Sequence, residues 1–120
     1  LNDEAWSRVF ALAAARGVPV NLHVTDPLAI TPGSCAKPTP LEPYVEMVKA
    51  HQATTFILAH WGGGLPFYEL NPRLRPLFKN VYYDTAASPL LYDHSVYRRV
   101  VDIVGAERIL WGTDYPLFTH

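Results

Sequence analysis

Short apolar runs alternate with helical segments along the whole chain, and this alternation constrains the fold more than any other feature. Apolar residues at helical spacing predict helices over residues 3–16, 41–51, 65–78 and 93–104, the third of them interrupted by Pro72 and Pro76. Runs rich in β-branched and aromatic residues predict strands over residues 18–24, 54–59, 81–84 and 109–114. Strands separated by helices are typical of βαβ units, in which the strands run parallel and both faces of the sheet are covered. The sequence therefore predicts an α/β fold with four parallel strands.

The composition fits one folded segment over residues 1–120. Hydrophobic residues make up 49% of the chain and charged residues 18%, which is typical of a protein with a packed core. The net charge is −1, without a basic or acidic block, so nucleic acid and anionic membranes are poor candidates as partners. Cys35 is the single cysteine and cannot form an internal disulfide. No apolar run approaches the roughly 20 residues of a membrane span. We therefore expect a soluble cytoplasmic protein.

Polar side chains that suit catalysis stand where the four predicted strands end. These side chains are His23, His60, Asp84 and Asp114. Right-handed crossovers place the carboxyl ends of parallel strands at the same edge of a sheet, so we expect all four residues to lie there. Active sites of parallel α/β folds occupy this edge. The sequence therefore predicts one functional site built from several strand ends.

Each histidine of this set has a functional and a structural interpretation. A neutral imidazole at His23 can bind a divalent transition metal, or it can form a hydrogen bond at the rim of the core. His60 precedes Trp61 and three glycines, Gly62-Gly63-Gly64, which allow a sharp turn and close approach to a ligand. In such a turn His60 can serve as a metal ligand or as a general acid or base, or it can be incidental.

The two aspartates are weaker candidates when taken alone. Asp114 can bind a metal or accept a proton from metal-bound water, but an aspartate near a proline is also common in turns. Asp84 can orient a catalytic histidine or cap the turn that follows it, and we favour the cap slightly. His51 and His94 lie in helical segments, where we expect them to be solvated.

Several aromatic residues accompany the predicted site. A proline-rich loop over residues 25–43, together with Trp61 and Tyr115, would shape a substrate pocket. Trp111 could join this apolar wall, although packing in the core explains it equally well. Trp6 is predicted to be a core residue of its helix.

Four stretches together resemble a known family. Residues 21–24, 57–63, 81–86 and 109–116 are similar, in this order, to the amidohydrolase-related metal-dependent hydrolases. This branch includes the enzymes similar to aminocarboxymuconate-semialdehyde decarboxylase and the lactonases of aromatic catabolism. The resemblance implies a (β/α)8 TIM barrel, of which this chain would supply strands five to eight, preceded by the fourth helix.

The resemblance also implies roles for three residues. His23 matches the metal-ligand histidine of strand five. His60 matches the strand-six histidine, which approaches the metal or exchanges protons with bound water. Asp114 matches the strand-eight aspartate, which binds the metal and can accept a proton. The family opens with a His-x-His pair of further metal ligands, and no His-x-His occurs in this sequence. We therefore expect the chain alone to be inactive.

The function expected from these features is that of a metal-dependent hydrolase. A divalent cation, zinc or alternatively manganese, would activate water to attack an ester, lactone or amide of a small-molecule substrate. Non-oxidative decarboxylation is a close variant within the same family. A second hypothesis is a catalytically silent half-barrel that associates with itself, because half a barrel exposes two strand edges and one sheet face. We therefore expect a homo-oligomer. A small nucleotide-binding domain ranks last, since no glycine-rich phosphate loop follows the first strand.

Overall fold

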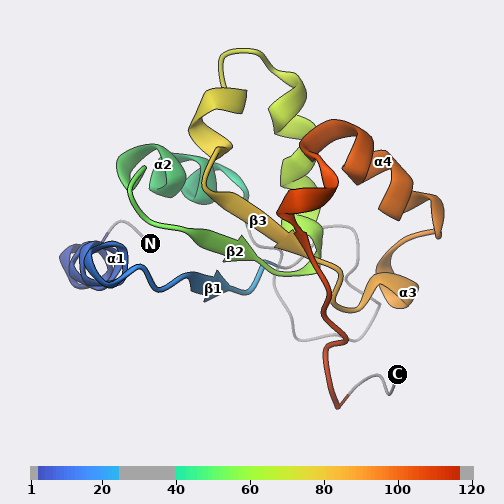
Figure 1. Cartoon of the computed structure of the whole chain (residues 1–120), viewed down its shortest axis with the longest axis horizontal. Helices are drawn as coiled ribbons and strands as arrows, with labels where there is room; N and C mark the ends of the chain where they lie inside the picture. The colour runs from blue at the N-terminus through green and yellow to red at the C-terminus, as the bar shows by residue number, and fades with distance from the viewer. Residues whose placement is uncertain (1–2, 25–39, 117–120) are drawn as a thin grey trace.

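The computed structural model describes residues 3–24 and 40–116, which form an alternating α/β chain (Figure 1). The elements, in chain order, are α1 (Glu4–Arg16), β1 (Val20–Leu22), α2 (Glu42–Ala50), β2 (Phe56–Leu58), η1 (His60–Leu70), η2 (Arg75–Phe78), β3 (Val81–Asp84), α3 (Ser88–Leu91), α4 (Ser95–Val104), η3 (Ala106–Arg108) and β4 (Ile109–Leu110). The predicted proline-rich loop and Cys35 fall largely or wholly outside the described residues.

The four strands form one parallel sheet in the order β1-β2-β3-β4. Each strand therefore neighbours the strand that precedes it in the chain, with one crossover between them. The register aligns Leu22 with Leu58 and Leu58 with Tyr83, so the carboxyl ends of β1, β2 and β3 lie level. The α/β class and the parallel sheet predicted from the sequence are confirmed.

Helices cover one face of this sheet (Figure 1). The strand residues facing them include Phe56, Leu58, Val81 and Tyr83, all at most 1% exposed. They belong to a core completed by side chains of the flanking helices, which include Met47, Val48, Leu65, Val100 and Val104. Burial of this apolar layer, at about 25 cal/mol per Å², is the main driving force for the helix–sheet packing.

The opposite face of the sheet is only partly covered in the described part of the chain. Residues that alternate with the core positions, Ile57, Tyr82 and Leu110, are half-buried there, and Asn21 is exposed. A shallow hollow of about 160 Å³ lies over Ile57, Tyr82 and Leu110. A parallel sheet is normally covered on both faces. This face therefore matches the inward side of a barrel wall of which residues 3–24 and 40–116 supply four strands.

A buried ion pair crosses the helix-covered side of the sheet. Arg108 donates two hydrogen bonds to the Glu69 carboxylate, Nη2 to Oε2 at 2.6 Å and Nη1 to Oε1 at 3.1 Å. The Tyr83 hydroxyl donates to Glu69 Oε1 at 2.8 Å. Arg108 also donates to the carbonyls of Phe78 and Val104 at 2.8 and 3.0 Å. The ion pair thus connects η1, η2 and α4 to β3, where a lone buried charge would be costly.

Helix α1 begins and ends with strong capping signals. The Asp3 carboxylate accepts a hydrogen bond from the backbone N–H of Ala5 at 3.0 Å, and Gly17 ends the helix with φ of 63°. The inward residue of this helix is Phe10, which is fully buried. The prediction that Trp6 is a core residue is wrong. Trp6 is 43% exposed and stacks on the ring of Phe10 from outside the core.

Several predicted boundaries are also wrong. The helix predicted over residues 65–78, with interruptions at Pro72 and Pro76, is two 3-10 segments, η1 and η2. Pro72 lies in the gap between them, and Pro76 stands in the first turn of η2. The strands over residues 18–24, 54–59 and 109–114 are shorter than predicted. His51 is not a fully solvated residue, since its ring packs edge-on against Phe10 at 5.0 Å. His94 is exposed, as expected.

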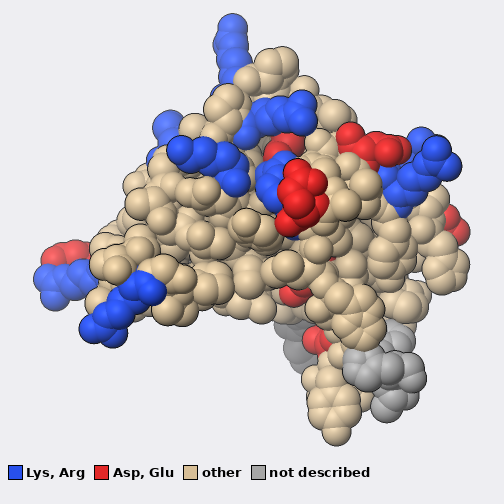
Figure 2. All heavy atoms as spheres, viewed as in Figure 1, with Lys and Arg blue, Asp and Glu red and all other residues tan. Residues whose placement is uncertain are grey.

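Charged side chains on the face shown in Figure 2 are of mixed sign, without a block of one charge among the described residues. None of the described helices is long and apolar enough to cross a membrane.

Candidate active site at the strand ends

The structure brings His23 and His60 together at the carboxyl edge of the sheet. His23 directly follows β1, and His60 stands two residues after β2, whose neighbour Ala59 donates a backbone hydrogen bond to the Leu22 carbonyl at 2.9 Å. The ring atoms His23 Nδ1 and His60 Nε2 are 3.1 Å apart, and the rings meet edge to face at 4.8 Å. The predicted convergence of these two histidines is therefore present in the fold.

The other ring nitrogen of His60 fixes its orientation. His60 Nδ1 lies 3.1 Å from the carbonyl oxygen of Ala86, which can only accept a hydrogen bond. The proton of a neutral His60 must therefore reside on Nδ1, which leaves the Nε2 lone pair facing His23. Metal-binding histidines are held in this way, with one nitrogen donating to a carbonyl and the other free to coordinate.

An unusual left-handed turn carries His60. His60 and Trp61 have φ of 58° and 56°, and Gly62, Gly63 and Gly64 continue with φ of 58°, 59° and 97°. A left-handed backbone costs an L-residue roughly 1–2 kcal/mol, whereas glycine adopts it readily. The three glycines therefore permit the turn, and the cost falls on His60 and Trp61. Strain of this kind at non-glycine residues clusters at functional sites.

Asp84 holds this turn in place from the end of β3. Its Oδ1 accepts hydrogen bonds from the backbone N–H of His60 at 2.9 Å and of Ala86 at 3.1 Å. Asp84 as a whole is only 9% exposed. Asp84 thus fixes both the backbone of His60 and the residue whose carbonyl orients the His60 ring. It caps the turn that follows β3 and orients a candidate histidine, which combines both interpretations of its sequence position.

Side-chain hydrogen bonds of neighbouring residues also hold the His60 turn in place. The indole N–H of Trp61 donates to Ser88 Oγ at 2.7 Å, and this hydroxyl donates to the Thr85 carbonyl at 2.6 Å. Thr85 Oγ1 accepts from the backbone N–H of Gly112 and donates to the Gly112 carbonyl, both at 3.1 Å. The segment after β3 therefore links the His60 turn to the segment after β4.

Tyr44 positions the other histidine. This residue of α2 is buried, and its hydroxyl donates to the His23 carbonyl at 2.7 Å. Burial raises the pKa of Tyr44 above its usual value of 10, so the hydroxyl keeps its proton at neutral pH. The sequence identified Tyr44 only as an apolar position of its helix. Nothing in its local pattern indicates a partner 21 residues away.

Asp114 does not join the two histidines in a ready metal site. It lies four residues after β4, half-buried, with φ of 65°. Among residues 3–24 and 40–116, no three His, Cys, Asp or Glu side chains form a group that could hold a metal ion. The predicted ligand set of His23, His60 and Asp114 is thus brought together only as far as the histidine pair.

The pair itself fits two positions of a metal site. Two imidazole nitrogens bound to one transition metal at about 2.0–2.1 Å lie roughly 2.9–3.4 Å apart for angles between 90° and tetrahedral. The observed 3.1 Å falls within this range. The ring orientation imposed by Ala86 suits coordination through His60 Nε2. Among the described residues, no third His, Cys, Asp or Glu joins this pair in a metal-binding group.

The aromatic residues predicted to shape the substrate pocket separate into two groups. Trp61 is 1% exposed and is locked behind the His60 turn, whereas Trp111 and Tyr115 are 69% and 77% exposed beyond β4. Packing in the core therefore does not explain Trp111. A role of Trp111 and Tyr115 in a substrate pocket stays a prediction.

The fold and the site define a class: parallel βα units with histidines at the strand ends, as in barrel enzymes that use metals. A family model described as Amidohydrolase matches residues 1–120. The chain therefore belongs to the amidohydrolase family. No curated protein matches it in sequence.

Solved structures of similar fold include two decarboxylases and a TIM-barrel protein. The 5-carboxyvanillate decarboxylase of Sphingomonas paucimobilis has a TM-score of 0.68 and 17% identity, covering 96% of this chain and 44% of its own. A dihydroxybenzoic acid decarboxylase from a Polaromonas species, with bound manganese and the inhibitor 2-nitroresorcinol, has a TM-score of 0.66 and 17% identity, covering 98% and 45%. A TIM-barrel protein of Bordetella bronchiseptica has a TM-score of 0.62 and 17% identity, covering 97% and 40%. The chain thus spans less than half the length of these proteins, as expected for half of a barrel.

Proposed function

We propose that this chain is the second half of a metal-dependent enzyme that decarboxylates a small aromatic carboxylate without oxidation. The observation that carries the proposal is the His23–His60 pair, 3.1 Å apart at the strand ends, with His60 oriented by the Ala86 carbonyl. Two structurally similar proteins are decarboxylases of aromatic acids, which favours this reaction over the hydrolysis expected from the sequence.

The proposed roles follow from the geometry of the chain. His23 and His60 would hold a divalent cation, manganese or zinc, together with ligands from the rest of the barrel. When bound, such a cation supplies positive charge that fixes the anionic oxygens of the substrate. Asp84 and Tyr44 keep the two histidines in position through the His60 N–H and the His23 carbonyl.

Asp114 is the proposed proton carrier, since both imidazoles would be occupied. In the reaction, a protonated Asp114 would give its proton to the ring carbon that bears the carboxylate. The bond between that carbon and the carboxylate then breaks, its electrons stay with the ring, and carbon dioxide leaves. Asp114 regains a proton from water. If instead His60 carries the proton, as the sequence also allowed, it cannot bind the cation through Nε2 at the same time.

The experiment uses the full-length protein that contains this segment. The purified protein is assayed for carbon dioxide release from 2,6-dihydroxybenzoate and for hydrolysis of a p-nitrophenyl ester, and its metal content is determined by elemental analysis. We expect decarboxylation that requires the metal, and loss of at least half of the bound metal in a His23→Ala variant. An Asp114→Asn variant should retain metal but lose about 100-fold or more in turnover. Full activity of metal-free protein, or ester hydrolysis alone, would refute the proposal.

Self-association is the second candidate for this chain, and the half-covered sheet face favours it. A second copy could cover Ile57, Tyr82 and Leu110 and pair with the edges of β1 and β4. Light scattering of the chain expressed alone tests this: we expect a dimer, and a stable monomer would contradict it.

A further inference from the structure

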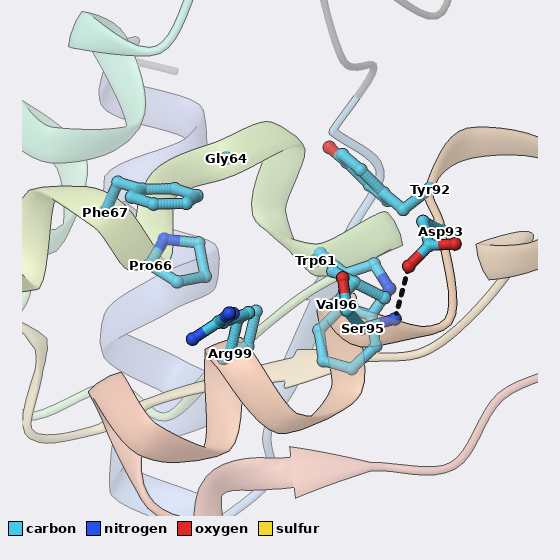
Figure 3. Close-up of a pocket in the computed structure, with 10 residues that line it drawn as sticks. Trp61, Gly64, Pro66, Phe67, Tyr92, Asp93, Ser95, Val96 and Arg99 are labelled. Carbon is cyan, nitrogen blue, oxygen red and sulfur yellow. Dashed lines mark hydrogen bonds between the residues drawn. The ribbon is translucent and has the colours of Figure 1, made fainter.

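A second cavity lies on the helix-covered side of the sheet, between η1 and α4 (Figure 3). Its volume is about 260 Å³, and the residues that matter for its chemistry are Trp61, Pro66, Phe67, Asp93, Val96 and Arg99. We propose that this cavity, the outer pocket, binds a small planar aromatic carboxylate, with its ring between the apolar walls and its carboxylate at Arg99. The proposed reaction assigns no role to this cavity, and the proposal does not depend on that reaction.

The walls of the outer pocket suit a flat ring. Pro66 and Phe67 come from η1 on one side and Val96 from α4 on the other, as Figure 3 shows. Trp61 is 1% exposed, yet it lines the pocket, while Phe67 is 63% exposed at the protein surface. An exposed phenyl ring beside an apolar cavity gains from contact with an aromatic ligand, because such pairs contribute beyond the area that they bury.

The charged groups set the polarity of the ligand. Arg99 and Asp93 stand at opposite ends of the pocket in Figure 3. The Asp93 carboxylate accepts the backbone N–H of Ser95 at 2.9 Å, and this hydrogen bond lowers the pKa of Asp93, so it stays charged at neutral pH. The Arg99 side chain has no hydrogen bond or ion pair within the described residues. An anion is therefore attracted to the Arg99 end and repelled from the Asp93 end, which selects one orientation.

Trp61 makes the occupancy of the pocket measurable. Its indole N–H is held by Ser88 Oγ at 2.7 Å, so its NMR signal has one fixed environment. A ring bound against Trp61 shifts that signal through its ring current. Trp6 and Trp111, which do not line the pocket, serve as internal controls.

The test is a titration of ¹⁵N-labelled full-length protein with benzoate and with benzamide, its neutral isostere. The indole signal of Trp61 is assigned with a Trp61→Phe variant. We expect a saturable shift of this signal alone, with benzoate binding about fivefold more tightly than benzamide, the upper end for a solvent-exposed ion pair. Absence of a saturable shift, or equal affinity for the two probes, overturns the proposal.

Two variants separate this pocket from the site at the strand ends. Arg99→Gln should remove the preference for benzoate, whereas Arg98→Gln, a matched change on the same helix outside the pocket, should keep it. Val96→Phe should fill the pocket and abolish the Trp61 shift while leaving turnover unchanged. A shift that survives Val96→Phe, or equal effects of the two arginine variants, places the probe elsewhere and refutes the assignment.

Discussion

Replacing Asp84 tests whether one carboxylate organises the candidate site. Its Oδ1 accepts two backbone N–H groups, from His60 and Ala86, and it is 9% exposed. A hydrogen bond to a charged group contributes about 1.5–3 kcal/mol. Loss of both, partly offset by water entering the space, should cost about 3–5 kcal/mol. We therefore expect Asp84→Ala to lower the free energy of unfolding by this amount.

Asp84→Asn is the matched control. The amide oxygen of asparagine can still accept both N–H groups, so only the contribution of the charge is lost, about 1–2 kcal/mol. The assay is urea unfolding of the full-length protein, followed by circular dichroism. Histidine ring NMR then reports whether the Nδ1-protonated form of His60 persists, which we expect in Asp84→Asn and not in Asp84→Ala. A cost below about 1 kcal/mol for Asp84→Ala, or equal costs for both variants, would refute this reasoning.

Three further predictions concern the surroundings of the site, and each is measured as a free energy of unfolding. A Cβ at Gly62 would lie 2.8 Å from the Tyr83 ring, whereas at Gly64 it would meet nothing within 4 Å. Gly62→Ala should therefore cost about 2–5 kcal/mol and Gly64→Ala only about 1–2; equal costs would argue against the clash. Arg108→Met leaves the buried Glu69 carboxylate without its ion-pair partner and should cost about 3–5 kcal/mol. Most of this cost should be recovered in the double variant Arg108→Met/Glu69→Leu, and a double variant as unstable as the single one would contradict this. Burial, and then the Glu69 carboxylate, raise the pKa of Tyr83 well above 10. The protonated Tyr83 hydroxyl contributes fully to the free energy of unfolding below pH 10, the pKa of tyrosine in the unfolded chain, and this contribution is lost as the pH rises further. Tyr83→Phe should therefore reduce the fall of the free energy of unfolding with pH above 10.

The sequence predicts the layout of this fold because each apolar run is short and is followed by a polar strand end. The level ends of β1 and β2, which join His23 to His60, follow from parallel pairing alone. Strand lengths are less predictable. Beyond the end of β3, the Thr85 side chain forms hydrogen bonds with the backbone of Gly112 in place of regular strand pairing. The spacing of apolar residues does not predict such a side-chain contact.

The supporting contacts of the site are the part that local patterns do not reveal. Tyr44 reaches the His23 carbonyl from another helix, and the Ala86 carbonyl that orients His60 belongs to another strand end. These contacts depend on tertiary packing, not on spacing. Trp6 shows the same limit, since helical spacing places it beside Phe10 but does not say how far the core extends.

The left-handed turn has a consequence for how tolerance to mutation should be interpreted. In a saturation scan, Gly62, Gly63 and Gly64 would lose tolerance through their backbone conformation, although no glycine carries a functional group. Asparagine accepts a left-handed backbone better than other residues with a side chain. At Gly64, where space is open, the Gly64→Asn variant should therefore pass a growth-based or fluorescence-based selection for functional protein, while no substitution at His60 does so. The Asn substitution at Gly64 would therefore distinguish a position that is restricted by its backbone conformation from one that is restricted by the chemistry of its side chain.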